Sequence, residues 1–211
     1  MTPDELYSAE CAAYARSRPR CRERAQRATH LHAGVPMHWM LDWPTPFPLI
    51  VAEARGATLT DIDGHVLADF CLGDTAAMFG HSPEPIARVL ATQAARGLTT
   101  MLPTQDAFEV GELLAARFRL PHWQIATTAS DANRFALRVA RAVTGRAKIL
   151  VFNGCYHGAV DETFVRLREG RPIHRTGLLG QFADLTQHTK VIEFNDVARS
   201  EEHTSELQSP I

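Results

Sequence analysis

The sequence has little lysine: Lys148 and Lys190 are the only two, and arginine supplies the rest of its 22 basic residues. It has no apolar run near the roughly 20 residues that a membrane-spanning helix needs, and no signal-peptide core at its start. Its four cysteines show no CxxC spacing, which indicates free thiols in a reducing cytoplasm rather than a metal or dithiol motif. The net charge of −2 gives no electrostatic reason to expect nucleic acid or membrane as a partner. The composition is that of an ordinary globular protein.

The first residues predict a helix that begins beside Thr2. Threonine can cap the helix, Pro3 suits its first position, and Glu5 completes a capping box. We expect the helix to run to about Arg18 and to be interrupted or restarted at Pro19. Six arginines cluster around this break: Arg16, Arg18, Arg20, Arg22, Arg24 and Arg27. Because no aromatic residues are interleaved with them, a solvated or subunit-facing helix surface is favoured over an RNA-binding one.

Residues 34–48 contain four prolines and three large aromatic residues, Trp39, Trp43 and Phe47. Such a composition is typical of an extended, non-helical connection. The aromatic side chains are compatible with the lining of a pocket and equally with an anchor on the domain surface.

Strands and helices then follow one another. Strands are predicted at 49–54, 58–62, 65–70, 163–167 and 191–194, helices at 82–97 and 104–120, and a polar loop at 168–187. Asp63-Gly64 is typical of a two-residue type I′ hairpin turn. In the second of these helices we expect the apolar residues to face inward, namely Ala107, Val110, Leu113, Leu114 and Phe118.

The most informative stretch runs from Trp123 to Gly158. It predicts a strand at 123–126, a hydroxyl-rich turn at 127–131, a helix to residue 145, an apolar strand at 148–152 and a loop at 153–158. The helix has apolar residues at the spacing of one buried stripe: Ala132, Phe135, Ala136, Val139, Ala140 and Val143. This order is that of a βαβ unit with parallel strands.

In such a unit both loops lie at the carboxyl ends of the strands, where open α/β sheets bind ligands. The first loop leads into a helix N-terminus, which favours an anion, and Thr127, Thr128 and Ser130 add hydroxyl groups. The second loop brings Tyr156 and His157 to the same edge. A phosphate seat beside an aromatic ring suits a flat, phosphorylated cofactor. The pattern is equally compatible with a plain helix cap at Thr128 or Ser130 and a packed Tyr156.

The segment 199–211 lacks the apolar periodicity, which ends at Val197. It resembles the in-frame translation of a common short-read sequencing adapter. We therefore expect a non-native, disordered tail and a gene that was cut off shortly after Asp196. A genuine disordered acidic tail is the alternative.

Five motifs in order resemble those of the class-III aminotransferases, the pyridoxal-phosphate (PLP) enzymes of fold type I. They are a "GAxxxDxDG" hairpin at 56–64, a glycine–histidine turn before a helix at 79–83, a segment at 127–132 in place of Asn-Ser-Gly-Thr-Glu-Ala, a strand at 148–152 and a "GxYHG" loop at 154–158. The resemblance covers roughly residues 34–196 and is strongest to the glutamate-1-semialdehyde aminomutase subgroup.

The resemblance implies an α/β fold. Residues 71–198 would form a partial PLP-binding large domain of fold type I, an incomplete and mostly parallel sheet with flanking helices. Residues 1–70 would supply the N-terminal helix, the proline-rich loop and the β-hairpin segment of the small domain. The resemblance also implies PLP as the cofactor and a homodimer in the full-length parent, with active sites near the subunit boundary.

Carried over by position, the resemblance implies that Thr128, Ala129 and Ser130 hold the cofactor phosphate by backbone N–H groups and hydroxyls. It implies that Tyr156 stacks on the pyridine ring and that His157 supports this ring. Ala129 stands where the family has glycine, which is tolerable only if φ is negative there.

Trp43 and Asp74 are the candidate substrate-contacting residues. The aminomutase subgroup has an arginine for the substrate carboxylate at the position of Met40 and a tryptophan at the position of Asp74. Because neither is present here, amino-group transfer between an amine or amino acid and an oxo acid or aldehyde is favoured over the aminomutase isomerisation. Asp74 would favour a cationic or amine group on the substrate.

PLP chemistry requires a Schiff-base lysine and an acid that holds the pyridinium N–H. In the family both residues lie beyond the point where this chain stops. Lys148 and Lys190 cannot substitute, because each opens a strand at the edge opposite the predicted ligand. We therefore expect this chain to be catalytically incompetent, and poorly soluble through its unpaired sheet edge.

Other functions are weaker. A Cys155/His157 nucleophile pair, as in a hydrolase, lacks an orienting third group. A metal site at His30, His32 and His38 lacks a carboxylate or cysteine ligand at suitable spacing, so we expect no metal. A non-catalytic PLP- or phosphate-binding domain fits the chain better than these two, since the chain would keep a phosphate seat without the lysine.

Overall fold

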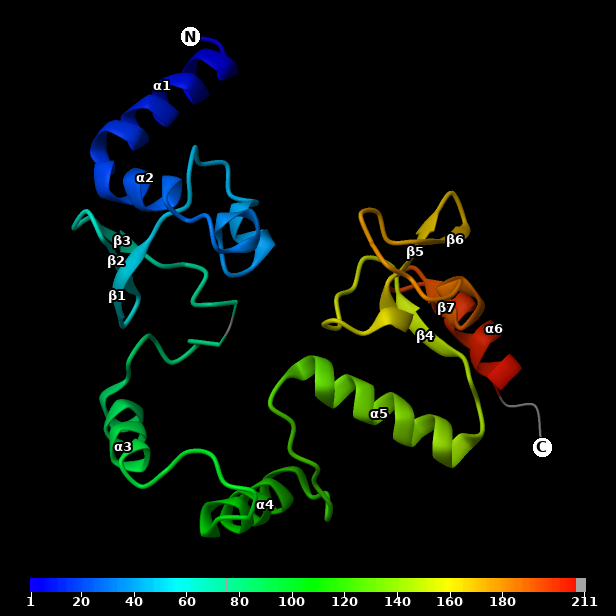
Figure 1. Cartoon of the computed structure of the whole chain (residues 1–211). Coiled ribbons are helices and arrows are strands. Elements are labelled where there is room, and N and C mark those ends of the chain that lie inside the picture. The colour runs from blue at the N-terminus through cyan, green and yellow to red at the C-terminus, as the bar shows by residue number, and fades with distance from the viewer. Residues whose placement is uncertain (75, 208–211) are drawn as a thin grey trace. The chain divides into compact units, whose positions relative to one another are not determined.

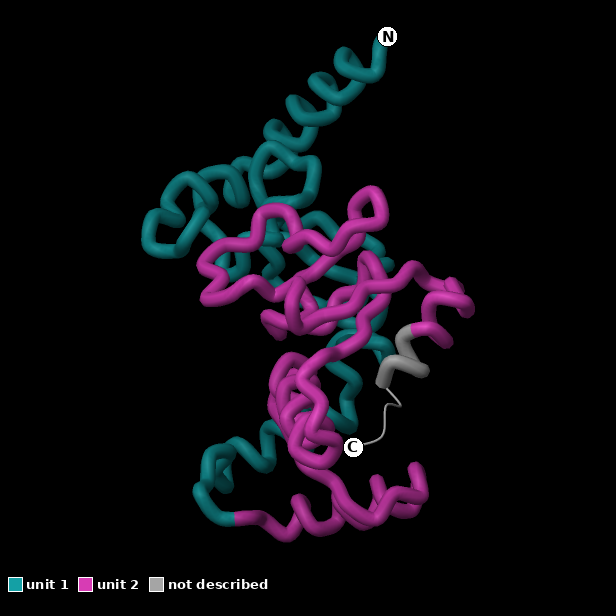
Figure 2. The backbone as a smooth tube through the Cα atoms, turned by 90° about the vertical axis from the view of Figure 1, so that its right-hand side faces the viewer, with its two compact units in different colours: residues 1–102 teal, residues 103–211 magenta. Residues whose placement is uncertain are grey.

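The computed structural model of the chain describes residues 1–74 and 76–207. It divides into two compact units, Met1–Leu102 and Pro103–Ile211, which are coloured separately in Figure 2. This division falls later than the domain boundary predicted between residues 70 and 71. That boundary concerns the domains of a longer protein, so it stays a prediction.

The helices and strands are labelled in Figure 1. The first unit contains α1 (Pro3–Ser17), α2 (Pro19–Gln26), the 3₁₀ turns His32–Gly34 and His38–Leu41, β1 (Val51–Arg55), β2 (Thr58–Asp61), β3 (Val66–Ala68) and α3 (Glu84–Ala94). The second contains α4 (Gln105–Phe118), α5 (Ala129–Thr144), β4 (Ile149–Phe152), the 3₁₀ turn Asp161–Thr163, β5 (Val165–Arg168), β6 (Arg171–His174), the 3₁₀ turn Leu185–Gln187, β7 (Thr189–Ile192) and α6 (Val197–Leu207).

The predicted start of the first helix is confirmed. The hydroxyl of Thr2 accepts the N–H of Glu5 at 3.2 Å, and the Glu5 carboxylate accepts the N–H of Thr2 at 2.8 Å. Helix α1 ends at Ser17 and α2 begins at Pro19, with Arg18 between them. Pro19 lacks the N–H needed to continue the hydrogen bonding of α1, and it suits the first turn of α2.

The three-stranded hairpin is confirmed, but the predicted type I′ turn is wrong. β2 pairs antiparallel with β1 and with β3. A type I′ turn needs positive φ at both central residues, and of the pair only Gly64 has it, with φ +93°. The N–H of Gly64 donates to the Asp61 carbonyl at 3.0 Å, and the Asp61 N–H donates to the His65 carbonyl at 3.0 Å. The connection is therefore a three-residue loop.

Two carboxylates, Asp61 at the end of β2 and Asp63 in the loop, hold the N-terminal helices. Asp61 is 1% exposed and accepts from Arg18 Nε at 3.0 Å and from both the N–H and the imidazole of His65. Asp63 accepts the N–H groups of Arg20 and Cys21, both at 2.9 Å. Those two N–H groups belong to the first turn of α2, which has no side-chain cap of its own. A residue distant in sequence therefore caps α2.

The core of the second unit lies around one parallel strand pair. β4 and β7 pair in parallel from Ile149 opposite Thr189 to Phe152 opposite Ile192. The buried cluster consists of Val151, Val165, Leu185 and Val191. β5 and β6 form a separate antiparallel pair, so the polar loop predicted at 168–187 contains a strand that was not predicted from the sequence.

The strand predicted at 123–126 is wrong, since this segment is irregular in the structure. An extended segment becomes a strand only when a neighbour supplies hydrogen bonds. Within the described residues, β4 pairs with β7 and with no segment preceding α5. The parallel character predicted for 148–152 is nevertheless confirmed by the β4–β7 pairing.

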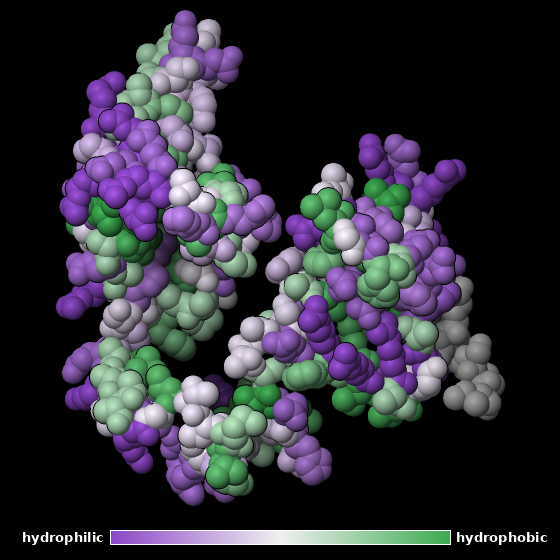
Figure 3. Space-filling model, viewed as in Figure 1, coloured by the Kyte–Doolittle hydropathy of each residue, from purple (hydrophilic) through white to green (hydrophobic). Residues whose placement is uncertain are grey.

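The apolar stripes of α4 and α5 are exposed, so their predicted burial is wrong for this chain. On α4 these include Val110, Leu113 and Phe118, and on α5 Phe135, Val139 and Val143. The half-buried face of α5 instead carries Ser130, Asn133, Leu137 and Arg141. Figure 3 shows hydrophobic side chains on the visible surface of α4. Periodicity located these apolar faces but says nothing about what covers them.

A helix, α6, occupies most of the segment for which a disordered tail was predicted. The carboxylate of Asp196 accepts the N–H of Arg199 at 3.0 Å, which satisfies one N–H of the first turn, and Arg199 pairs with Glu202 at 3.5 Å. The disorder predicted for 199–207 is thus corrected, and 208–211 lie outside the described residues. The predicted adapter origin stays a prediction. No helix among the described residues is long and apolar enough to cross a membrane.

Replacement of Asp61 by alanine should weaken the first unit strongly. It leaves the largely buried Arg18 guanidinium without its carboxylate, and breaking a buried ion pair from one side costs about 3 kcal/mol or more. Urea unfolding followed by tryptophan fluorescence measures this loss. Glu23→Ala, which removes the exposed partner of Arg27, is the control and should cost far less.

The same carboxylate should give the chain an acid-sensitive component of stability. Burial raises the pKa of Asp61, but hydrogen bonds from His65 and Asp63 outweigh it and hold the pKa below 3.8. Its contribution is complete above the ordinary pKa and is lost as the pH falls through the folded value. Asp61→Asn should flatten this acid limb; an unchanged limb would contradict the assignment.

Candidate phosphate and cofactor site

The N-terminus of α5 has its own cap and still retains free N–H groups. Thr128 is extended, with φ −132° and ψ 154°; its hydroxyl accepts the N–H of Asp131 at 3.1 Å and donates to the Asp131 carboxylate at 2.8 Å. The N–H groups of Thr128, Ala129 and Ser130 have no acceptor among the described residues. Ala129 is absent from the positions with positive φ, so the condition for replacing glycine there is met.

The loop after β4 comes to this helix N-terminus, as Figure 1 shows. The N–H of Ala159 donates to Ser130 Oγ at 3.0 Å, and Asn133 Nδ2 donates to the carbonyl of His157 at 2.9 Å. The prediction that the two polar loops meet at one edge is therefore confirmed, although the strand expected before the first loop is absent.

Glycine is required where the loop touches the helix. Gly158 has φ +81°, and a Cβ on it would lie 2.1 Å from Ser130 Oγ and 3.0 Å from Ser130 Cα. Real Cβ atoms do not approach other atoms this closely. The second glycine of the "GxYHG" motif thus has a steric reason in this chain, which is the contact between the two loops.

Tyr156 lies in this loop and is 70% exposed. The guanidinium carbon of Arg175 lies 5.8 Å from the centre of its ring, within the range of a cation–π contact. Tyr156 therefore does not pack into a core, and its neighbour His157 is half-buried and held through its carbonyl. Free amides at the helix and an exposed aromatic ring occur in two segments that hydrogen bonds join.

Two residues that were not predicted from the sequence hold the loop from the sheet side. Asn153, directly after β4, accepts the N–H of Leu167 at 2.9 Å and donates to Glu193 at 2.8 Å. Arg166, on β5, donates to the carbonyl of Cys155 at 2.7 Å. Burial first, and then the neighbouring charge of Arg175, lower the pKa of Arg166. Of these two residues, only Asn153 could have been suspected from the sequence, because it is a polar residue directly after a strand.

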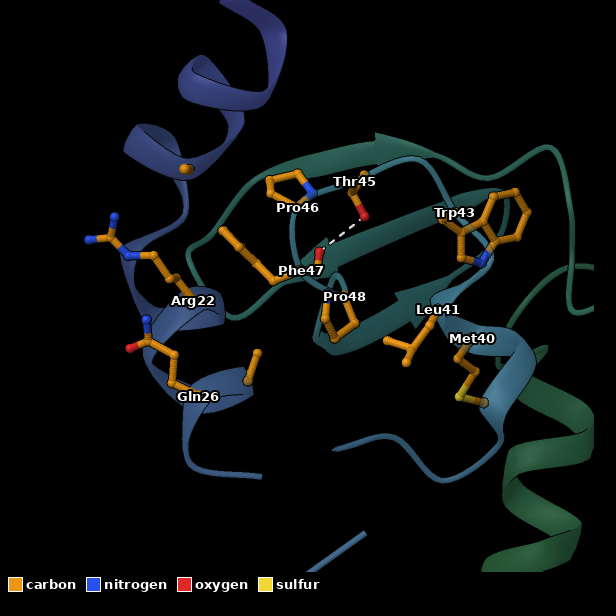
Figure 4. A pocket seen from close by; sticks show the side chains of 11 residues that line it. Arg22, Gln26, Met40, Leu41, Trp43, Thr45, Pro46, Phe47 and Pro48 are labelled. Atoms are coloured by element: carbon orange, nitrogen blue, oxygen red, sulfur yellow. Dashed lines mark hydrogen bonds between the residues drawn. The ribbon is translucent and has the colours of Figure 1, made fainter. Parts of the chain in front are cut away.

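The candidate substrate residues lie in the first unit, and the structure does not group them. Trp43 lines a cavity of about 500 Å³ together with residues of α2 and the proline-rich loop, Met40 included (Figure 4). Asp74 is not a lining residue; it lies in a turn with φ +55°, and its N–H donates to the Cys71 carbonyl at 3.1 Å. Pocket lining is thus observed for Trp43, and both substrate roles stay predictions.

The rival sites gain no support. Cys155 and His157 share no hydrogen bond in the structure, and the carbonyl of each is bonded to a different partner. Among the residues that the structure describes, no three histidine, cysteine or acidic side chains gather to hold a metal ion.

Comparison with known proteins defines first the fold and then the family. The solved structures that resemble the chain are PLP-dependent transferases of fold type I. The family model described as "Aminotransferase class-III" matches residues 40–209. The chain belongs to the class-III aminotransferase family, whose cofactor is PLP. The match runs past Asp196, where the sequence resemblance was expected to end.

Three relatives illustrate the likeness. The crystal structure of a glutamate-1-semialdehyde aminomutase from Pseudomonas aeruginosa PAO1 is 43% identical, with a TM-score of 0.92 over 96% of this chain and 45% of that one. A transaminase solved with PLP bound is 29% identical, with a TM-score of 0.78 over 88% of this chain and 44% of that one. The glutamate-1-semialdehyde 2,1-aminomutase of Methanopyrus kandleri is 32% identical over 72% of this chain and 36% of its own length. The chain thus spans less than half the length of each.

Gly158→Ala should separate the loop from α5. Gly154 has the same φ of +81°, but a Cβ added to it would meet nothing within 4 Å, so Gly154→Ala is the matched control for backbone strain alone. We expect Gly158→Ala to cost about 1–3 kcal/mol more than the control, because it adds a steric clash. Hydrogen exchange of the Ala159 amide should quicken in Gly158→Ala only. Equal effects of the two substitutions would contradict the required close contact.

Proposed function

We propose that the second unit binds PLP without a covalent bond, with its phosphate on the N–H groups of Thr128, Ala129 and Ser130. The observation that supports this most directly is the group of unpartnered amides at the α5 N-terminus, tied to a loop with an exposed tyrosine. A helix N-terminus favours a phosphate through its free N–H groups and its dipole. Tyr156 stacks on the cofactor ring, and His157 supports it.

The backbone contributes more to this seat than the hydroxyl groups do. The Thr128 hydroxyl already donates to Asp131, so it has no proton left for a phosphate oxygen. The Ser130 hydroxyl accepts from Ala159 and keeps its own proton for donation. We therefore propose that the backbone amides bind the phosphate and that the Thr128 hydroxyl only caps α5.

PLP, when bound, supplies the electron sink for reactions at the carbon that bears the amino group. The residues of this chain orient its ring and phosphate. Lys148 precedes β4, and Lys190 lies early in β7, opposite Leu150. Both are therefore at the far end of the strands from the 153–158 loop, and we propose that the chain by itself does not transaminate.

For the whole protein we propose amino-group transfer between an amine or amino acid and an oxo acid or aldehyde. Met40 and Asp74 in place of the arginine and tryptophan of the aminomutase subgroup support this choice. The second candidate is the aminomutase isomerisation, which is favoured by the name of the 43% identical Pseudomonas relative.

We further propose a homodimer for the full-length protein and a cytoplasmic location. Exposed apolar residues on α3 and α4, such as Leu90 and Leu113, support a further interface. The four cysteines are all free, which fits a reducing compartment.

Ala129→Pro tests the phosphate seat by removing a single N–H group. Proline suits the first helical position, and the extended backbone of Thr128 is the conformation that precedes proline most readily. We expect affinity for inorganic phosphate and for PLP to fall about tenfold, as for one lost hydrogen bond to an anion. Equilibrium dialysis measures both.

Ala129→Gly keeps the N–H group and is the control, with affinity close to that of the wild type. Equal affinities of the proline and glycine variants would rule out the seat. Borohydride treatment of the PLP complex should fix no cofactor on Lys148 or Lys190; stoichiometric labelling of either lysine would contradict the non-covalent assignment.

A further inference from the structure

The second turn of α5 presents two more polar groups to the loop after β4. Asn133 Nδ2 donates to the His157 carbonyl at 2.9 Å, and Arg134 Nη2 donates to the Ala159 carbonyl at 2.6 Å. With Ser130 these residues have i, i+3 and i+4 spacing, which places them on one side of the helix. We call the three side chains, Ser130, Asn133 and Arg134, the α5 clamp.

The clamp and the sheet hold Tyr156 from both sides. The carbonyl of Cys155, the residue before it, accepts from Arg166 on β5 at 2.7 Å. The carbonyl of His157, the residue after it, accepts from Asn133 on α5. The backbone of Tyr156 is therefore fixed at both neighbours while its side chain stays exposed.

We infer that Asn133 and Arg134 are positioning residues that set the Tyr156 ring at the correct distance from the phosphate seat. This inference rests on the proposed PLP function. The phosphate and the ring of one cofactor are separated by a fixed number of bonds, so their two binding groups must keep a fixed separation. α5 provides both references: its first amides hold the phosphate, and its next turn holds the loop with the ring.

The contacts with the clamp go to backbone atoms, so they control where the loop lies and not its side-chain chemistry. Neither Asn133 nor Arg134 touches the amides of the phosphate seat. Loss of the Asn133 or the Arg134 contact should therefore weaken binding of the whole cofactor and leave binding of phosphate alone unchanged. That separation distinguishes a positioning role from a general structural one.

The chain offers matched variants for this test. Arg134→Met removes the donor and one positive charge, and Arg138→Met removes the same charge one turn further along α5, where no hydrogen bond or ion pair is formed among the described residues. Asn133→Leu removes the other donor without adding charge. Affinities for inorganic phosphate and for PLP are measured by equilibrium dialysis.

We expect Arg134→Met and Asn133→Leu to bind PLP about tenfold more weakly than Arg138→Met does. Their affinities for inorganic phosphate should lie within about twofold of that of Arg138→Met. Arg134→Lys keeps a donor and should recover part of the loss. A PLP loss as large in Arg138→Met as in Arg134→Met, or a parallel loss of phosphate binding, would overturn the inference.

A double-mutant cycle with Tyr156→Ala tests whether the clamp acts through the ring. Tyr156→Ala should lower PLP affinity in the wild type. In the Asn133→Leu background the same substitution should cause a loss of affinity about five times smaller, as expected for coupled residues. Strictly additive losses would show that the clamp does not act through Tyr156.

Failure of this inference is distinguishable from failure of the proposed function. A wild-type chain that binds neither phosphate nor PLP refutes the function and the inference with it. A wild-type chain that binds both, with additive losses in the cycle, refutes the inference alone. Hydrogen exchange across β4 and β7 identifies a variant that has lost its fold, and Arg134→Lys compared with Arg138→Lys then decides the question.

Discussion

The candidate site in the second unit depends on one close contact, that between Ser130 at the start of α5 and Gly158 in the loop after β4. The loop reaches the helix only because residue 158 lacks a Cβ. Once there, its backbone donates to Ser130 and accepts from Asn133. Polar contacts, not apolar burial, thus fix the geometry of the candidate site. This explains how the site is ordered although the apolar stripe of α5 is exposed.

The first-turn N–H groups are satisfied by a protein carboxylate in α2 but are left partly free in α5. Both helices have first-turn N–H groups that need acceptors. In α2 the groups of Arg20 and Cys21 are satisfied by Asp63 from the hairpin loop, and this contact docks the helix. In α5 the cap residue Thr128 satisfies one N–H and leaves the others for a ligand. Of these two helices α5 is therefore the candidate anion site, although the cationic residues cluster around α2.

Local features could be predicted from the sequence because local chemistry determines them. The capping box at Thr2 and the helix end at Gly145 are of this kind. The meeting of the two polar loops is a tertiary contact, and it was predictable because the order of a βαβ unit places both loops at one edge. The strand expected at 123–126 failed because a strand requires a partner, which the segment itself does not encode. The type I′ turn failed because Asp63 is used to cap α2 and keeps a negative φ.

Tertiary partners also explain the residues that were missed at the site. In the sequence Arg166 does not differ from an exposed surface arginine. Only the structure shows that its guanidinium donates to the Cys155 carbonyl. Asn133 and Arg134 read as the polar face of an amphipathic helix. Their partners are backbone atoms, which leave no trace in side-chain pattern, so no spacing rule points to them. The residues Tyr156 and His157 were predicted because they lie in the loop after a strand of the βαβ unit and in the "GxYHG" motif.

The positions of the two lysines, Lys148 and Lys190, bear on how the chain could bind a cofactor. The two lysines stand at the start of the paired strands, and the cofactor loops follow the strand ends, roughly 10 Å or more away at 3.3 Å per residue. The proposed phosphate seat is therefore distant from both lysines along the strands. In the non-covalent binding that we propose, affinity depends on the amides and the ring acting together. The separation between them, which α5 fixes, then matters more than any single contact.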